Sequence, residues 1–228
     1  MKNAIIAIIF DVETTGLLRK YVSLEQSPYV LQFSYIVYNM ESHQILKTVN
    51  SYVKVPSHVV IPPDASAVNG ITRETCDNEG KDIREILTEF YHDYHTVDML
   101  IAHNYSFDSA ILSIEFKRNL MGESCPFALN LFQPLYMEKI GMQHMCTMES
   151  STNMCAIAFP DNGKTSSTRR GYKWPTLEEL YTHLFAKKPD NLHNSIIDCM
   201  ICLRCVLKIN LAYDITDVAF EEMLAAVL

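Results

Sequence analysis

The longest apolar stretch near the start of the chain ends abruptly at two acids. Residues 4–10 are all apolar, and Asp11 and Glu13 follow with one valine between them. Seven consecutive apolar residues are typical of a strand buried on both faces of an α/β sheet. Because side chains alternate along a strand, Asp11 and Glu13 point the same way. Two converging carboxylates suit a hard divalent cation, although this motif taken alone favours a loop in which both carboxylates are solvated.

The rest of the hydrophobic pattern alternates between strands and helices. Apolar-rich runs over residues 29–40 and 44–53 flank a short polar turn and predict an antiparallel hairpin. Apolar residues at helical spacing predict helices over 81–94 and 105–119, with a short buried strand at 99–102 between them.

The second half of the chain continues this alternation. A strand is expected at 143–148, and a helix begins after Pro175 with a capping box from Thr176 to Glu179. A long helix is expected over 194–209 and a shorter one in the tail, whereas 56–72 reads as a loop and 122–141 mixes helix and loop signals. This order predicts an α/β fold, a mixed sheet with helices on its faces. Ligands collect beyond the carboxyl ends of strands in such sheets, which is where Asp11 and Glu13 lie.

Composition narrows the class of protein. The chain has 228 residues, of which 48% are hydrophobic, which predicts a single domain over 1–228 with a core at 4–210 and a helical tail at 211–228. The net charge of −8 argues against a broad basic surface for long duplex DNA, but not against a narrow cleft where bound metal ions supply positive charge.

The cysteines and apolar runs suggest the compartment. Seven cysteines show no secreted-framework spacing, and the apolar runs are too short to span a bilayer. Asp11 and Glu13 stand where a signal peptide would need small residues at its cleavage site. We therefore expect a protein of a reducing compartment, cytoplasmic or nuclear, neither secreted nor in a membrane.

Two further polar sites follow in the sequence. Asp108 falls in the first turns of the helix expected after residues 99–102, where an acid is also favourable in its own right. His193 precedes the last long helix and Asp198 lies about one turn inside it, so both side chains can face one site. Each of these sites alone is weak support for a metal centre.

Together, the three sites resemble the DEDDh family of 3′→5′ exonucleases, a ribonuclease H-like group that includes the proofreading subunit of bacterial DNA polymerase III, ribonuclease T and the TREX nucleases. The resemblance rests on Phe10-Asp11-Val12-Glu13-Thr14-Thr15-Gly16-Leu17, on His103-Asn104 with Phe107-Asp108, and on His193 five residues before Asp198. The tyrosine branch of the superfamily would have a tyrosine at position 194, which is Asn194 here. The segment Val68-Asn69-Gly70-Ile71-Thr72 is similar to a family segment that has a histidine in place of Asn69.

The resemblance implies a ribonuclease H-like three-layer fold, with a mixed five-stranded sheet, one antiparallel strand and helices on both faces. It also implies that Asp11, Glu13, Asp108 and Asp198 hold two divalent cations, Mg²⁺ or Mn²⁺, with Asp11 between them. His193 would act as general base on the attacking water, since imidazole commonly titrates near neutral pH. The products would be nucleoside 5′-monophosphates.

The implied substrate is the 3′ end of a single-stranded or frayed nucleic acid, with DNA slightly favoured over RNA. The resemblance assigns its contacts to Thr14, Thr15, Gly16, Leu17, Ile71, Asn104 and Phe107, although Leu17 and Phe107 are equally compatible with core packing. Several relatives are dimers, so a homodimer is possible. His103 is expected to be hydrogen-bonded rather than catalytic.

Several alternatives stay open at this point. A catalytically inactive binding or scaffold protein is disfavoured because all four acids and the histidine are present, and an endonuclease is disfavoured by the histidine placement. Cys199, Cys202 and Cys205 are better explained as packed helix residues than as a zinc site. Lys164, Arg169 and Arg170 belong to a loop that is either a substrate-binding flap or simply solvated.

Overall fold

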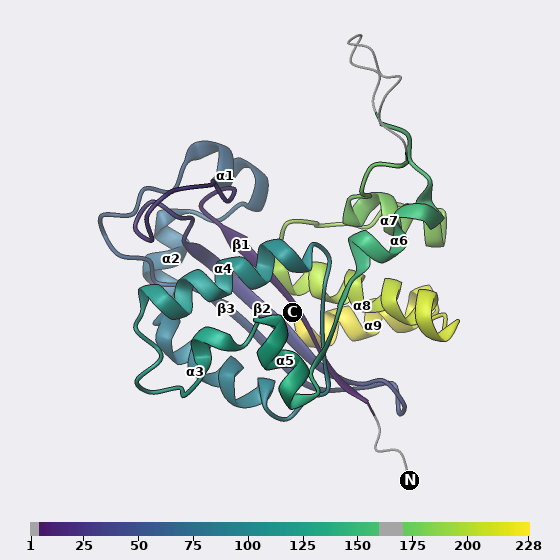
Figure 1. Cartoon of the computed structure of the whole chain (residues 1–228). Helices are drawn as coiled ribbons and strands as arrows, with labels where there is room; N and C mark the ends of the chain where they lie inside the picture. Colours follow the sequence, from purple (N-terminus) through teal and green to yellow (C-terminus); the bar gives the residue numbers. More distant parts are fainter. Residues whose placement is uncertain (1–4, 160–170) are drawn as a thin grey trace.

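The apolar stretch that opens the chain forms the central strand of a five-stranded sheet (Figure 1). A computed structural model describes residues 5–159 and 171–228, so the predicted flap with Lys164, Arg169 and Arg170 lies outside the described residues. The strands lie in the order β3-β2-β1-β4-β5, with bounds β1 Ile6–Thr14, β2 Val30–Asn39, β3 Gln44–Tyr52, β4 Met99–Ala102 and β5 Gln143–Cys146. β2 is antiparallel to both of its neighbours, while β1, β4 and β5 run parallel. The sheet is therefore mixed with one antiparallel strand, as the resemblance implied.

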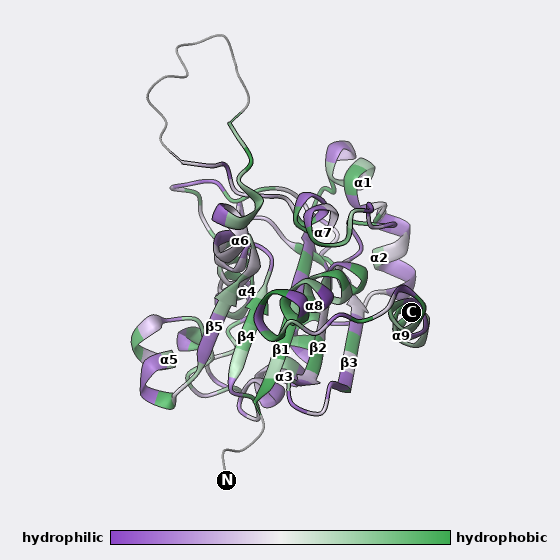
Figure 2. Cartoon of the chain, turned by 90° about the vertical axis from the view of Figure 1, so that its right-hand side faces the viewer, coloured by the Kyte–Doolittle hydropathy of each residue, from purple (hydrophilic) through white to green (hydrophobic). Residues whose placement is uncertain are grey.

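Helices cover both faces of this sheet, which gives three layers (Figure 1). Ile8, Phe10 and Val12 of β1 pack in one core with α3 and α4, and Ala7 and Ile9 pack in the other with α7, α8 and α9. The helices are α1 Pro63–Asn69, α2 Arg73–Glu79, α3 Ile83–Tyr94, α4 Tyr105–Arg118, α5 Pro134–Ile140, α6 Thr147–Cys155, α7 Leu177–Phe185, α8 Ser195–Leu211 and α9 Asp217–Val227, with a 3-10 turn at Ala128–Asn130. Figure 2 shows that the inner strands β1 and β2 are mainly hydrophobic, consistent with burial between the layers.

Most predicted elements are present. The hairpin, the strand at Met99–Ala102 and the helices α3, α4, α8 and α9 lie within a few residues of their expected bounds. The capping box is also confirmed, because Thr176 accepts from the backbone of Glu179 and the Glu179 side chain accepts from the backbone of Thr176. Local hydrophobic spacing and helix-capping residues were sufficient to predict these elements from the sequence.

Two predictions, one of a loop and one of a strand, are wrong in part. Residues 56–72 contain the short helix α1, which begins at Pro63 and ends at Gly70, whose φ of 71° is in the left-handed region that glycine adopts easily. The strand predicted over 143–148 stops at Cys146, and α6 begins at Thr147. Both helices are short, and α1 contains no buried residue, so hydrophobic periodicity gave no signal.

The first strand is longer than its apolar run. β1 continues through the two acids to Thr14, because Asp11 pairs with Ser34 and Glu13 with Gln32 on the neighbouring strand β2. The acids therefore lie on regular extended backbone, and their positions are fixed by the sheet.

The three helix cysteines are packed residues, as predicted. Cys199, Cys202 and Cys205 are free thiols, each at most 2% exposed, on the face of α8 that meets the sheet and α7. Buried Arg204 on the same helix donates to the Ile215 carbonyl and to Asp217, which holds the start of α9 against α8.

Candidate active site

Four carboxylates converge at the end of the sheet where β1 stops. Asp11 and Glu13 lie on the face of β1 that packs against α8, by the same alternation that places Ala7 and Ile9 there. Asp108 and Asp198 stand in the first turns of α4 and α8 and are only 3% and 8% exposed. The charges of Asp108, Asp198 and Glu13 all act on Asp11, so the three segments singled out in the sequence form one site.

His193 joins this cluster through a tight turn before α8. Its φ of 67° is left-handed, an uncommon conformation for a residue with a side chain, and its backbone N–H donates to Asp198 Oδ2 at 3.1 Å. The side-chain ligand atoms of Glu13, His193 and Asp198 all lie within 4.8 Å of one another. His193 itself is exposed, so its imidazole stands between the buried acids and solvent.

Burial and mutual repulsion hold protons on these carboxyls. Burial, reinforced by the charge of Glu13, raises the pKa of Asp198 to about 8. Burial also raises the pKa of Glu13 to about 7, although a hydrogen bond from Asn69 opposes the shift. The pKa values of Asp11 and Asp108 are raised well above the usual range, again chiefly by burial and then by their acidic neighbours. The cluster therefore needs positive charge before all four groups ionise near neutral pH.

The donor set fits divalent cations. Asp198 Oδ1 is buried and has no hydrogen-bond partner among the described residues, while Oδ2 is used by His193. A buried, unpaired carboxylate oxygen beside three further acids is what an oxygen-preferring cation such as Mg²⁺ or Mn²⁺ requires. The residues present are thus compatible with the cations that the resemblance implies.

The raised pKa values predict how the metal-free protein responds to pH. Carboxyls of the unfolded chain titrate near pH 4, whereas Glu13 and Asp198 titrate near 7 and 8 in the fold, so between these limits the folded protein binds more protons. Its stability must then fall as pH rises through that window. We expect the melting temperature in chelator to drop on the order of 5 °C between about pH 5 and about pH 9. Added Mg²⁺ should remove most of this drop in thermal unfolding scans, and an equal drop with and without Mg²⁺ would contradict the assignment.

A tight turn follows the acids and forms the predicted seat for the terminal nucleotide. The Thr14 hydroxyl donates to the Gly16 carbonyl at 2.7 Å and accepts from the Gly16 N–H at 3.3 Å. Thr15 is bonded to Tyr29 at the start of β2. Leu17 is 80% exposed, so it is not a core residue and its side chain is free to contact a ligand.

The other predicted substrate contacts differ in accessibility. Ile71 is 2% exposed and packs in the core with α3 and α4, so its side chain offers no surface for a base, which argues against that assignment. Phe107 is partly buried against the same core. Asn104 ends the turn before α4 with a φ of 100°, and its Oδ1 accepts from the Ser106 hydroxyl at 3.2 Å.

His103 is hydrogen-bonded on both ring nitrogens, in agreement with the prediction. Nε2 lies 3.1 Å from the Pro175 carbonyl, which can only accept, so Nε2 carries the proton and Nδ1 accepts from Thr147 at 2.9 Å. Burial lowers the pKa of His103 to about 4, so the ring is neutral near pH 7. This histidine ties the end of β4 to the starts of α6 and α7.

A polar network that the sequence analysis missed fixes the start of α8. Gln32, only 1% exposed, accepts from the Ser195 N–H at 3.2 Å through Oε1. Its Nε2 donates to Asn50 at 2.9 Å and to Asn194 at 3.3 Å. Ser34 lies 2.6 Å from the Ser195 hydroxyl and also donates to Asn50. Gln32 and Ser34 are polar residues at alternate positions of an otherwise apolar strand, opposite Glu13 and Asp11, and that pattern is the signal that could have revealed them.

Removing this network is expected to misplace His193 and Asp198. In Gln32→Leu the first N–H of α8 and the Asn194 side chain lose their partner, and Asn50 keeps only Ser34. We therefore expect turnover to fall roughly 10- to 100-fold, the effect of a displacement near 1 Å. Steady-state kinetics with a single strand would check this, with Gln44→Leu at an exposed position of β3 as the matched control. Equal turnover in the two variants would rule out a positioning role.

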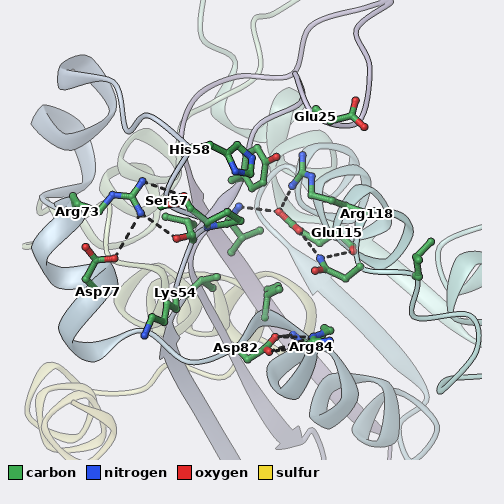
Figure 3. Close-up of a pocket in the computed structure, with 18 residues that line it drawn as sticks. Glu25, Lys54, Ser57, His58, Arg73, Asp77, Asp82, Arg84, Glu115 and Arg118 are labelled. Carbon is green, nitrogen blue, oxygen red and sulfur yellow. Dashed lines mark hydrogen bonds and ion pairs between the residues drawn. The ribbon is translucent and has the colours of Figure 1, made fainter.

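A large cavity lies elsewhere, between α2, α3, α4 and the start of β2 (Figure 3). Its volume is about 1060 Å³. Each of its three arginines faces a carboxylate of the same cavity: Arg73 faces Asp77, Arg84 faces Asp82 and Arg118 faces Glu115 (Figure 3). The arginine charges of this cavity are therefore already neutralised by its own acids.

Comparison with known proteins agrees with this geometry. The family model described as Exonuclease (RNase_T) matches residues 8–206, which include all four acids and His193. The chain belongs to this exonuclease family. Members of this family, the DEDD-type 3′→5′ exonucleases of the ribonuclease H-like superfamily, generally use divalent metals. A search of curated protein sequences finds no match.

Solved structures of bacterial exonuclease I have the same fold as this chain. Exonuclease I of E. coli in complex with a dT13 oligonucleotide superposes with a TM-score of 0.64 at 17% identity, over 91% of this chain and 42% of that one. The enzyme of Methylocaldum szegediense gives 0.61 at 18% identity, over 97% and 43%. The chain thus spans less than half the length of these proteins. None of its described helices is long and apolar enough to cross a membrane.

Proposed function

We propose that this exonuclease removes nucleotides from the 3′ end of single-stranded or frayed DNA and releases nucleoside 5′-monophosphates. The observation that carries the proposal is the meeting of Glu13, His193 and Asp198 within 4.8 Å, beside Asp11 and Asp108, at the end of β1. Two divalent cations, Mg²⁺ or Mn²⁺, would be held by the four carboxylates. When bound, they supply positive charge for the attacking and leaving oxygens of an in-line displacement at phosphorus.

His193 is the proposed general base. Its ring is exposed, so a water molecule can reach it, and its backbone is held by Asp198 at 3.1 Å. The imidazole accepts the proton of the attacking water while Asp198 keeps the turn in place. Asp198 can thus affect activity in two ways, by holding a cation and by holding the backbone of the proposed general base, His193.

The turn from Thr14 to Leu17 is the proposed seat of the terminal nucleotide. The hydrogen bonds between Thr14 and Gly16 fix the turn, and Leu17 projects from it into solvent, where it can contact the last base. Contact of this apolar kind carries little base preference, which suits an enzyme that trims any sequence. The preference for DNA follows the oligonucleotides bound to exonuclease I, including dT13 and dA16.

Product identification tests this proposal. Single strands of DNA and RNA with the same sequence would be incubated with Mg²⁺, and the small products would be identified by chromatography against standards. We expect nucleoside 5′-monophosphates from the start of the reaction and faster release from DNA. Early oligonucleotide fragments would instead indicate an endonuclease, and nucleoside 3′-monophosphates would contradict the proposed displacement.

A further inference from the structure

The segment that follows the nucleotide seat presents its side chains outward. Leu17 is 80% exposed, Arg19 and Lys20 are exposed, and Tyr21 is fully exposed at 102%. Leu18 is the exception, because it turns inward and packs against the core formed with α3 and α4. Leu18 thus anchors a short exposed tip, residues 17–21, which carries one aliphatic, two cationic and one aromatic side chain.

The two ends of this tip are held firmly. The Thr15 N–H donates to the Tyr29 carbonyl at 2.9 Å, and the Tyr29 N–H donates to the Thr15 hydroxyl at 3.0 Å. Arg118 of α4 donates to three carbonyls of the returning chain, those of Leu24, Ser27 and Pro28, at 2.7, 2.9 and 3.1 Å. The tip is therefore presented from a fixed base, immediately beside the carboxylate cluster.

Tyr21 lies in a turn and adopts a left-handed backbone conformation. Its φ of 62° lies in the left-handed region, which is unfavourable for a bulky residue. Its hydroxyl makes no hydrogen bond and its ring packs on no aromatic neighbour among the described residues. The unfavourable backbone conformation of Tyr21 is not compensated by packing of its ring within the protein. Strained backbone of this kind occurs more often at functional sites.

The adjacent cations are also unpartnered. Arg19 and Lys20 form no ion pair in the part of the chain that the structure describes, whereas the adjacent pair Lys187 and Lys188 is matched to acids. The chain has a net charge of −8, and four acids stand at the neighbouring site. A polyanion that enters this site therefore meets free positive charge first at the tip.

We propose that Arg19, Lys20 and Tyr21, next to Leu17 of the seat, form a second binding surface for a single strand, 5′ of its last two nucleotides. Tyr21 stacks on an unpaired base, while Arg19 and Lys20 contact backbone phosphates. This inference rests on the proposed function, which places the 3′ end at the seat beside the tip. A ring that stacks on a base also selects for single strands, because bases within a duplex are already stacked on one another.

Substrate length separates this surface from the seat. A dinucleotide fills the seat but does not extend along the tip, whereas a strand of about 12 nucleotides reaches both. We expect Tyr21→Ala to lower kcat/KM for the longer strand roughly 5- to 100-fold, mainly through KM, and to leave the dinucleotide nearly unchanged. Tyr21→Phe keeps the ring and should retain most of the activity on both substrates.

The cations are tested by the salt dependence of binding. Binding of a fluorescent oligodeoxythymidylate in Ca²⁺ would be measured by anisotropy over a range of salt concentrations. Arg19→Ala with Lys20→Ala should reduce the slope of log affinity against log salt by about 1.4, that is, about 0.7 for each lost contact. The matched control is Lys117→Ala with Lys139→Ala, an equal charge change at exposed lysines that also lack ion pairs among the described residues. Its slope should equal that of the wild type.

The outcomes separate this inference from the proposed function. If the wild type releases nucleotides but the Tyr21 and Arg19/Lys20 variants behave like the control, the binding surface is wrong and the exonuclease assignment stands. If the wild type releases no nucleotides, the proposed function fails, and the anisotropy measurement alone tests whether the tip binds a single strand. Affinity loss in both tip variants supports it, and unchanged affinity overturns it.

Discussion

Replacing Asp11 with asparagine is expected to lower exonuclease turnover roughly 10² to 10⁴-fold or more. Asp11 interacts with Asp108, Asp198 and Glu13, the other three acids of the cluster. Asparagine preserves the shape of the side chain but removes the charge that a shared cation position requires. The loss should appear in kcat with a single-stranded substrate under saturating Mg²⁺, and it should persist at higher Mg²⁺ concentrations.

The same substitution should stabilise the metal-free protein. Burial and acidic neighbours raise the pKa of Asp11 in the fold, so its ionised form is unfavourable without a cation. We expect Asp11→Asn in chelator at alkaline pH to melt on the order of 3 °C higher than the wild type. A protein that is more stable yet inactive cannot owe its inactivity to unfolding. Asp64→Asn, at an exposed acid in the first turn of α1, is the control and should retain wild-type turnover and stability.

Replacing His193 with alanine is expected to cost roughly 10² to 10⁴-fold in turnover, the usual contribution of a general base. The hydrogen bond to Asp198 comes from the backbone of His193, so alanine leaves that contact in place and removes only the imidazole. Cation binding should therefore change far less than turnover. His58→Ala removes another exposed histidine, one that lines the separate cavity, and should have little effect.

Chemical rescue sharpens this second experiment. His193 is exposed, so the space left by its ring is open to small solutes. Added imidazole should restore part of the lost turnover of His193→Ala and should not stimulate the wild type. Near-wild-type turnover in His193→Ala without imidazole would remove His193 from the proposed mechanism.

The central strand and the acidic motif were readable from the sequence because each depends on local pattern. Seven apolar residues require a buried strand, and alternation then places Asp11 and Glu13 on one face. The continuation of β1 to Thr14 was not readable, since it depends on pairing with Gln32 and Ser34 of a distant segment. Sequence spacing gives the direction of a side chain, but tertiary pairing decides where the strand ends.

The surroundings of the site were less predictable. Ile71 was predicted to contact the substrate, yet it follows Gly70 at the end of α1 and its side chain is buried in the core. That burial results from tertiary packing, which no local sequence pattern shows. The segment that follows Tyr21 is held by Arg118 of α4, almost a hundred residues later, through the carbonyls of Leu24, Ser27 and Pro28. The support of α8 by Gln32 likewise joins residues more than 160 positions apart.

A direct test of the central claim follows the shortening of a single strand labelled at its 5′ end. With Mg²⁺, the wild-type protein should produce a ladder that shortens progressively from the 3′ end, and chelator should abolish it. Asp11→Asn should give no ladder over the same time course. A single internal cut, cleavage that persists in chelator, or an intact strand with Mg²⁺ and with Mn²⁺ would contradict a cation-dependent 3′→5′ exonuclease site at the end of β1.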